Sequence, residues 1–517
     1  SPFCRLRHRP SGRPASIPQR LFAMSKNRLY PVLFLALGPV TLSIGEALRL
    51  DLPSAIERAL ERNFAVRIER IEARVALQEL RAAEGAFDPE LRSSYTYERQ
   101  SSVFSTVDDE DASMHIGLGS TLPWGTEWEV GLEASDRTSP FDLQTGSALD
   151  SVTSFAGVTV TQPLLRNAGR VGSYTGVRVA REAVRSDWEL FRSRVMDLVT
   201  DTVTAYHNLY FARENLRIAR ENRDLALKLL EDNRKRVETG AMAPLDLLQA
   251  ESEAALREDN VIRARSFLDQ ARNVLKELVW DDPRSVLSVE LEIEPPAEPG
   301  WFNPDPARDL AIALRERPEL LASQAGLQIR RFEASRLERN ALPRLDLVGS
   351  IGRLGVDRSL RDSLDRTLDD GENAYSIGAV FSLPFPNRTR SALRAQAYLR
   401  RNQAELGLQE LELAIRLEID DAATRLKADW SRIQAARTAR ELAGRSLAAE
   451  EKKLQAGTSS TFVVLRLQGD LAVAEIREIN ALTDYAISLS RYHRARGRIL
   501  EEFDIRLQMD RPASLEK

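Results

Sequence analysis

Hydrophobic residues recur with two different periods along this chain, and each period predicts its own kind of element. Between Gly172 and Glu238, apolar residues follow one another at alternating steps of four and three, the heptad spacing of a helix that packs lengthwise against other helices. This stretch of 67 residues contains no proline, so a continuous helix through it would be about 100 Å long. Such a helix cannot fold into a compact ball, and it needs partners along its whole length.

The heptad seam is rich in alanine and threonine, which lets neighbouring helices approach closely. It continues in the second half of the chain, and it is interrupted at Arg223 and Asp429. The seam positions are Phe191, Val195, Leu198, Thr202, Ala205, Leu209, Ala212, Leu216, Ala219, Ala226 and Leu230, and then Ile415, Ile419, Ala422, Leu426, Ile433 and Ala436.

Other segments alternate apolar and polar residues with a period of two, which is typical of β-strands. The clearest are residues 128–135, 345–351 and 374–383. By itself, this pattern fits either a strand of a transmembrane β-barrel or a half-buried strand of a soluble sheet. The strands are too few to close a barrel within one chain, and they interrupt a helical array.

The chain carries the same plan twice, as three pairs of similar segments in the same order show. KRVETGAMAPLDLLQA (235–250) resembles KKLQAGTSSTFVVLRL (452–467), FAGVTVTQPLLRN (155–167) resembles SIGAVFSLPFPNR (376–388), and GAFDPELRSSY (85–95) resembles NALPRLDLVGS (340–350). Each pair alone is a weak signal, but the shared order indicates a duplication.

Each copy is expected to begin with a shorter helix, at Ser54–Glu84 and at Pro306–Arg339. Alternating segments, a long helix, a glycine turn and another long helix follow. Residues 281–306, between the copies, contain six prolines and cannot continue a helix, so they form a connector. At the turns, Gly240 and Gly457 are expected to cap the preceding helices with positive φ.

The amino-terminal segment has the pattern of an export signal. Residues 1–45 contain no Asp or Glu, and a basic region with Lys26 and Arg28 precedes a mostly apolar run from Leu29 to Ile44. We therefore expect translation to start at Met24, a signal peptide over 24–47, and residues 1–23 to lie upstream of the true start. The alternative is an N-terminal membrane anchor, which the prolines and the shortness of the run disfavour.

Composition narrows the class of protein further. Lys and Arg number 73 against 77 Asp and Glu, so the net charge of −4 gives no global field that would attract nucleic acid. The one cysteine, Cys4, excludes an internal disulfide, and the four histidines are scattered, so the sequence indicates no metal site and no cofactor. Phosphate-binding glycine loops, nucleophile elbows and His-Glu metal motifs are also missing, and we expect no enzyme.

The duplicated layout resembles the TolC-like outer membrane efflux protein family, also called outer membrane factors. The residues that carry the resemblance are the turns Thr239-Gly240 and Ala456-Gly457, the strand ends Gln162-Pro163-Leu164 and Leu383-Pro384-Phe385, and the repeated helix–strand–helix order. The resemblance covers roughly residues 48–505. No single motif is specific to the family, but the ordered duplication is.

The resemblance implies an α+β membrane protein that works as a homotrimer in the outer membrane of a Gram-negative cell. Three copies would pool their strands into one transmembrane β-barrel, continued by a periplasmic α-helical coiled-coil tunnel. Residues 48–280 and 307–505 would be the two repeats, 281–306 an equatorial connector beside the C-terminal segment, and 506–517 a tail.

The first copy departs from the family's two strands. Between Pro89 and Pro163 it has 73 residues, against 40 between Pro343 and Pro384, and the surplus includes an expected hairpin over 118–136 with a turn at 123–126. Either the barrel gains strands, or the hairpin projects outward. We expect two strands per copy plus this extra hairpin, with solvent-facing loops at 107–111 and 137–150.

In the family, polar and acidic residues just after the glycine turns constrict the pore. Asp246 stands at the first such position, and Val463 and Arg466 stand at the second pair, so the expected constriction consists of these three residues. We expect Asp246 and Arg466 to pair across neighbouring helices in the shut state, or else to be two solvated surface charges. With fewer carboxylates, cation preference should be weaker than usual for the family.

The resemblance also implies partners and a function. A periplasmic adaptor would dock at the turns Gly240 and Gly457, and an inner-membrane pump of RND or ABC type would supply the cargo to this exit duct for efflux or type I secretion. The alternative is an exported coiled-coil scaffold or adaptor-like interaction protein without a pore. The sequence does not indicate the cargo.

Overall fold

The computed structural model describes residues 6–7, 48–100, 109–139, 149–240 and 243–507, so the expected signal peptide, 24–47, lies outside the described residues. The chain divides into two compact units. Unit 1 comprises Ser1–Glu69, Phe191–Pro318 and Leu413–Lys517, and unit 2 comprises Arg70–Leu190 and Glu319–Glu412. Each unit therefore draws on both sequence repeats.

Two long helical hairpins supply most of unit 1, and the stretches 175–190 and 388–412 at the start of each hairpin belong to unit 2. Helix α4 (Thr175–Glu238) is followed by α5 (Pro244–Val279), and α9 (Arg388–Gln455) by α10 (Thr461–Ala495). The heptad seam is confirmed as the packing stripe, since Phe191, Val195, Leu209 and Leu426 are each at most 2% exposed. The first long helix begins three residues later than predicted, because the short helix α3 (Gly169–Ser173) ends before it at Tyr174.

The core between α9 and α10 is aromatic. Tyr485 and Tyr492 are fully buried against Leu426 and Ile433, with Trp430 packed at the margin. The interrupting Asp429 also lies in this interface, where the Ser488 hydroxyl donates to it at 2.5 Å and Arg432 lies 3.0 Å away. The break in the heptad pattern is thus a hydrogen-bonded link between the two helices.

Both of the predicted shorter helices are broken, which corrects the sequence interpretation. Ser54–Glu84 becomes α1 (Leu52–Arg62) and α2 (Phe64–Glu84), and Pro306–Arg339 becomes α6 (Pro306–Glu316) and α7 (Pro318–Asn340). The second break is caused by Pro318, which disfavours helical backbone at Arg317 (ψ 122°). At the first break, extended Asn63 caps α2 through its side-chain oxygen, which accepts from Ala65 N–H at 2.9 Å.

Short strands tie the connector to the amino-terminal end of the described fold. β2 (Leu48–Leu50) pairs in parallel with β7 (Leu291–Ile293), which lies within the predicted connector. Among the described residues, the C-terminal segment contains α11 (Ile499–Glu502) and β10 (Arg506–Leu507), and β10 pairs with β1 (Leu6–Arg7).

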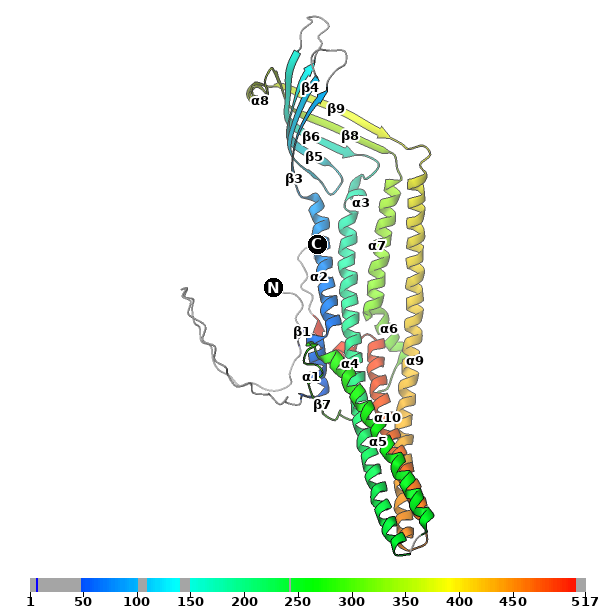
Figure 1. The fold of residues 1–517 in the computed structure, drawn as a ribbon. Coiled ribbons are helices and arrows are strands. Elements are labelled where there is room, and N and C mark those ends of the chain that lie inside the picture. The colour runs from blue at the N-terminus through cyan, green and yellow to red at the C-terminus, as the bar shows by residue number, and fades with distance from the viewer. Residues whose placement is uncertain (1–5, 8–47, 101–108, 140–148, 241–242, 508–517) are drawn as a thin grey trace, which may run out of the picture. The chain divides into compact units, whose positions relative to one another are not determined.

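Unit 2 contains one antiparallel sheet, in which the described residues form six strands in the order β3-β4-β5-β6-β8-β9 (Figure 1). Around the sheet lie the 3-10 turn η1 (Gly85–Phe87) and helix α8 (Leu360–Asp369). The strands are β3 (Glu90–Gln100), β4 (Asp109–Thr121), β5 (Glu127–Ser139), β6 (Leu149–Pro163), β8 (Arg344–Asp357) and β9 (Glu372–Ser382).

The strand registers give this sheet two chemically different faces. One cross-strand row runs Leu91, Leu118, Val130, Val158, Ile351 and Tyr375 through all six described strands. The row on the opposite face runs Glu90, Gly119, Glu129, Thr159, Ser350 and Ser376. The apolar face is open to its surroundings, since Leu91 is 72% exposed and Tyr375 84%. Period-two alternation in the sequence therefore predicted the faces of the sheet.

The hairpin predicted over 118–136 is present, but its strands are longer than predicted. β4 begins at Asp109 and β5 ends at Ser139. The prediction of loops over 107–111 and 137–150 is therefore wrong for residues 109–111 and 137–139, which belong to these strands. Backbone pairing with β3 and β6 extends the strands, and the sequence shows no alternation of apolar residues there. Residues 101–108 and 140–148 lie outside the described residues.

Helix α8 was not predicted from the sequence. It covers one end of β6 and β8 on the apolar face, where Ser154 Oγ lies 2.8 Å from Ser363 Oγ and 2.6 Å from Thr367 Oγ1. All three hydroxyl side chains are fully buried. Gly355 makes the close approach possible, since a Cβ there would lie 2.5 Å from the Ser363 carbonyl oxygen. In the described part of the chain, no helix is both long and apolar enough to cross a membrane.

Candidate functional site

The two glycine turns close the helical hairpins of unit 1 in the same way. Gly240 has φ +75° and Gly457 has φ +76°, so both glycines occupy the left-handed region. Their N–H groups donate to Val237 O at 3.0 Å and to Leu454 O at 3.1 Å, which satisfies carbonyls of the last helical turn. The prediction that these glycines cap helices is confirmed.

A hydrogen-bonded carboxylate secures the second turn. The Ser459 hydroxyl donates to Glu450 Oε1 at 2.5 Å, and Lys453 Nζ lies 2.9 Å from Oε2. The hydrogen bond from Ser459, followed by that from Lys453, lowers the pKa of Glu450, so the carboxylate is charged and fixed near neutral pH.

A groove of about 860 Å³ lies between the two hairpin tips. It is lined by the end of α4, the start of α5, the end of α9 and the start of α10. Asp246 and Arg466 both line it, so the structure brings together two of the three predicted constriction residues. Val463, which is 36% exposed, is not among the lining residues.

Within this single chain, Arg466 has a partner on its own helix. Its Nε lies 4.0 Å from Asp470 Oδ2, one turn further along α10, and both side chains are exposed. Asp246 is exposed in the first turn of α5, where a carboxylate interacts favourably with the helix dipole. The expected pair between Asp246 and Arg466 stays a prediction.

Sequence reasoning missed two residues of the groove. Arg257 on α5 pairs with Glu253 and lies against Gly469 of α10, where an added Cβ would be 2.6 Å from Nη2. A glycine inside a helical pattern is a signal of close approach, and Gly469 could have been noticed for this reason. Asn233 is 1% exposed at the groove, and neither of its amide atoms has a hydrogen-bond partner in the described part of the chain. Nothing in the sequence pattern distinguishes it.

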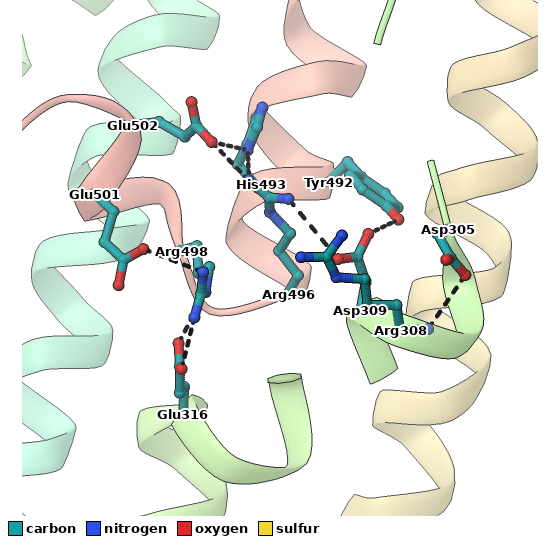
Figure 2. Close-up of polar contacts among 10 residues, drawn as sticks. All are labelled: Asp305, Arg308, Asp309, Glu316, Tyr492, His493, Arg496, Arg498, Glu501 and Glu502. Carbon is teal, nitrogen blue, oxygen red and sulfur yellow. Dashed lines mark hydrogen bonds and ion pairs between the residues drawn. The ribbon is translucent and has the colours of Figure 1, made fainter. Parts of the chain in front are cut away.

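A second polar cluster anchors the C-terminal turn to α6 (Figure 2). Buried Asp309 accepts a hydrogen bond from the Tyr492 hydroxyl, and Arg496 Nη1 lies 3.8 Å from its other oxygen. Arg498 makes a two-point contact with Glu316, at 3.0 and 2.9 Å. These bonds cross more than 180 residues of sequence, so they attach the end of the second repeat to its beginning.

His493 is the titratable centre of this cluster. Its Nδ1 lies 2.9 Å from Arg496 Nη2 and 3.2 Å from Glu502 Oε1, while Arg496 also donates to Glu502 at 2.6 Å. Burial, reinforced by the charge of Arg496, lowers the pKa of His493 to about 3. The ring is therefore neutral at pH 7, and it packs edge-on against Phe302 of the connector.

Helix α4 is tied to the strand pair β2–β7. The Tyr206 hydroxyl lies 2.7 Å from the carbonyl oxygen of Glu294 and 3.1 Å from that of Leu50, and Arg213 donates to Ile293 O at 2.7 Å. Burial raises the pKa of Tyr206 to about 12, so its proton stays on the hydroxyl. Among the described residues, no group of three His, Cys, Asp or Glu could hold a metal ion.

Comparisons with known proteins match this architecture. The family model for outer membrane efflux protein matches residues 55–279 and 310–498. The alkaline protease secretion protein AprF of Pseudomonas aeruginosa is 24% identical over 335 residues, which are 63% of this chain and 66% of AprF. The outer membrane efflux protein BepC of Brucella suis is 23% identical over 333 residues, 62% of this chain and 68% of BepC. This chain therefore spans about two thirds of the length of these relatives.

A solved structure shows the same fold. The Campylobacter jejuni CmeC outer membrane channel superposes with a TM-score of 0.67 at 17% sequence identity, covering 86% of this chain and 85% of that one. The predicted α+β fold class with a duplicated helix–strand–helix plan is thus confirmed.

Proposed function

Because this chain belongs to the outer membrane efflux protein family, we propose that it is the outer membrane exit duct of a tripartite efflux or type I secretion system. It passes solutes from an inner-membrane pump, of RND or ABC type, and a periplasmic adaptor to the outside of a Gram-negative cell. The family consists of channels rather than enzymes, and the role requires no covalent chemistry and no cofactor.

The two-faced sheet of unit 2 is the observation that carries this proposal. Its apolar face exposes large side chains, including Leu91, Tyr95, Tyr375 and Ile377, each at least 69% exposed. A patch of this kind is unfavourable in water and favourable against lipid. The opposite face presents carboxylates and hydroxyls, as the wall of a water-filled passage requires.

The sheet has two edges, β3 and β9, and open edges are costly in lipid because their backbone groups find no water. Closure by rotational symmetry removes both edges without any additional chain. A homotrimer therefore supplies a closed barrel, and the long helical hairpins of the three copies supply the tunnel. The proposed division of the chain is an export signal at 24–47, repeats at 48–280 and 307–505, the connector 281–306 and a tail at 506–517.

The tips of the hairpins are the proposed gate. Asp246 and Arg466 line one groove there, with Val463 on the same turn of α10, so opposite charges lie close to the end of each hairpin pair. Exposed pairs contribute only about 0–1 kcal/mol each, but three symmetry-related copies act together. The glycine turns Gly240 and Gly457 are the proposed docking surface for the tips of the adaptor.

Charge removal at the tips tests the gate. Asp246→Ala or Arg466→Ala should raise the single-channel conductance in planar bilayers, because either change removes the attraction that holds the tips together. Glu258→Ala, an exposed carboxylate further along α5, is the control and should leave the conductance unchanged. Unchanged conductance in both tip variants would refute the gate assignment while leaving the channel itself intact.

The exit duct itself is tested by extraction and reconstitution. The full chain should remain in the membrane after a salt wash, dissolve in mild detergent with the mass of three copies, and give stepwise currents in planar bilayers. A coiled-coil scaffold without a pore would be released by salt and conduct nothing. A monomer with full β content and ordered helices would also contradict the proposal.

A further inference from the structure

The extra hairpin β4–β5 is bonded into the sheet along its whole length. β4 pairs with β3 from Glu90–Gly119 to Gln100–Asp109, and β5 pairs with β6 from Glu127–Thr161 to Ser139–Leu149. An outward-projecting hairpin would leave β3 and β6 to pair with each other, and the registers instead place two strands between them. The hairpin is thus an integral part of the sheet.

The faces of the hairpin continue those of its neighbours. Leu118 and Val130 stand in the apolar row, and Glu129 stands in the polar row on the other face. On the polar side of the hairpin, His115 Nε2 lies 3.1 Å from Glu129 Oε1, and exposed Glu133 stands four positions further along the same face of β5. A hairpin outside the wall would have no reason to keep this alternation in phase with the other four strands.

The turn of the hairpin is anchored at the end of the sheet where β6 leads into α3. Gly125 has φ +94° and its N–H donates to Leu122 O at 2.7 Å, while Gly169 N–H donates to Trp124 O at 2.9 Å. The Thr126 hydroxyl bonds the side chain of Gln162 in the neighbouring strand. The hairpin therefore runs the full height of the sheet.

The two edge strands match each other. β3 and β9 have 11 residues each, and five successive antiparallel pairings make them run in opposite directions. Both carry tyrosine and aliphatic side chains on the same apolar face, such as Tyr95 and Tyr375. An edge of this length and direction fits the opposite edge of a second copy as an antiparallel ladder.

We infer that three copies of this chain close an eighteen-stranded barrel, with β3 of each copy paired to β9 of the next and the hairpin β4–β5 as two wall strands per copy. This inference rests on the trimer of the proposed function. Barrels of 16–18 strands enclose an aqueous channel, so the barrel is wide and the helical tips remain the narrowest point. The hairpin also lines this channel with Glu129 and Glu133.

Thiol labelling tests whether the hairpin lies in the wall. In the full chain with Cys4→Ser, Glu133→Cys faces water and Val130→Cys faces lipid, three residues away on the same strand. In proteoliposomes, a water-soluble, membrane-impermeant maleimide should label Glu133→Cys several-fold faster than Val130→Cys. Equal labelling of the two sites in an intact trimer would overturn the inference, since both faces of a projecting hairpin meet water.

Disulfide trapping tests which strands are neighbours. Tyr95→Cys on β3 should link to one of Asn373→Cys, Tyr375→Cys or Ile377→Cys on β9 of the next copy, giving covalent multimers on denaturing gels. Tyr95→Cys with Ala156→Cys on β6 is the matched control, and it should not link. A β3–β6 link within one chain would establish a narrower barrel without the hairpin and refute eighteen strands. Failure of the wild type to trimerise at all would refute the proposed function instead.

Discussion

At the scale of single residues, two buried carboxylates are held by hydrogen bonds. Asp309 is 5% exposed and is held by Tyr492 and Arg496, and Asp429 is 5% exposed and is held by Ser488 and Arg432. A buried carboxylate that loses a donor retains the cost of desolvation, so its partners contribute to stability beyond their own packing.

Loss of one hydroxyl should therefore be measurable. Tyr492→Phe should lower the free energy of unfolding by about 1.5–3 kcal/mol, because the bond to Asp309 is charge-assisted. Tyr210→Phe is the control, because Tyr210 is a partly buried residue of α4 whose hydroxyl has no hydrogen bond to the described residues. This substitution should change the free energy of unfolding by less than about 0.5 kcal/mol. Urea unfolding in detergent measures both. Equal effects would show that Asp309 does not depend on Tyr492.

At the scale of elements, the two repeats use the same local devices with different residues. A short helix breaks before a longer one in each copy, at Asn63 by side-chain capping and at Arg317 through the following proline. Both hairpins end at a left-handed glycine. Neither break was predicted, although Pro318 was a visible signal for the second one.

Two glycines on one hairpin should respond to alanine with opposite signs. Gly457→Ala forces a Cβ into the left-handed region and should cost about 1–2 kcal/mol. Gly444→Ala lies inside α9, where the nearest neighbour of an added Cβ is Leu471 Cδ1 at 3.9 Å, and it should stabilise by about 0.5–1 kcal/mol. The free energy of unfolding in urea reports both changes. The same sign for both variants would contradict the left-handed turn.

At the scale of the whole molecule, stability should depend on two buried histidines. Burial lowers the pKa of His207 to about 4, and burial with Arg496 lowers that of His493 to about 3. Unfolded histidines bind protons below about pH 6.5, and the folded ones do not until the pH falls much further. The contribution of these two neutral rings to the free energy of unfolding is therefore fully present above about pH 6.5. It declines as the pH falls towards the pKa values of the folded protein.

Between pH 7 and pH 5, each histidine should remove up to about 1.4 kcal/mol of stability per pH unit once the unfolded form is protonated. His207→Gln and His493→Gln should each flatten the dependence of the unfolding free energy on pH. At pH 8 each variant should differ from the wild type by a constant offset. A slope unchanged by both substitutions would show that the two rings bind protons equally in the folded and the unfolded protein.

The sequence by itself determined the periods, because side chains on a helix and on a strand repeat at fixed intervals whatever they pack against. The heptad seam, the alternating strands, the hairpin turn near 123–126, the glycine caps and the duplication all depend on such local geometry. Asp246 and Arg466 were identified differently, through the resemblance to the efflux protein family, by aligning the residues that follow the glycine turns.

Only the tertiary structure decided which segments are neighbours. The pairing of β4 with β3 and of β5 with β6, the packing of α8 on Ser154, and the contact of Arg257 with Gly469 all join residues whose local patterns say nothing of each other. The same holds for Asp309 and Tyr492, 183 residues apart. Long-range contacts depend on the complementary shape and charge of two surfaces, and a single stretch of sequence describes only one of them.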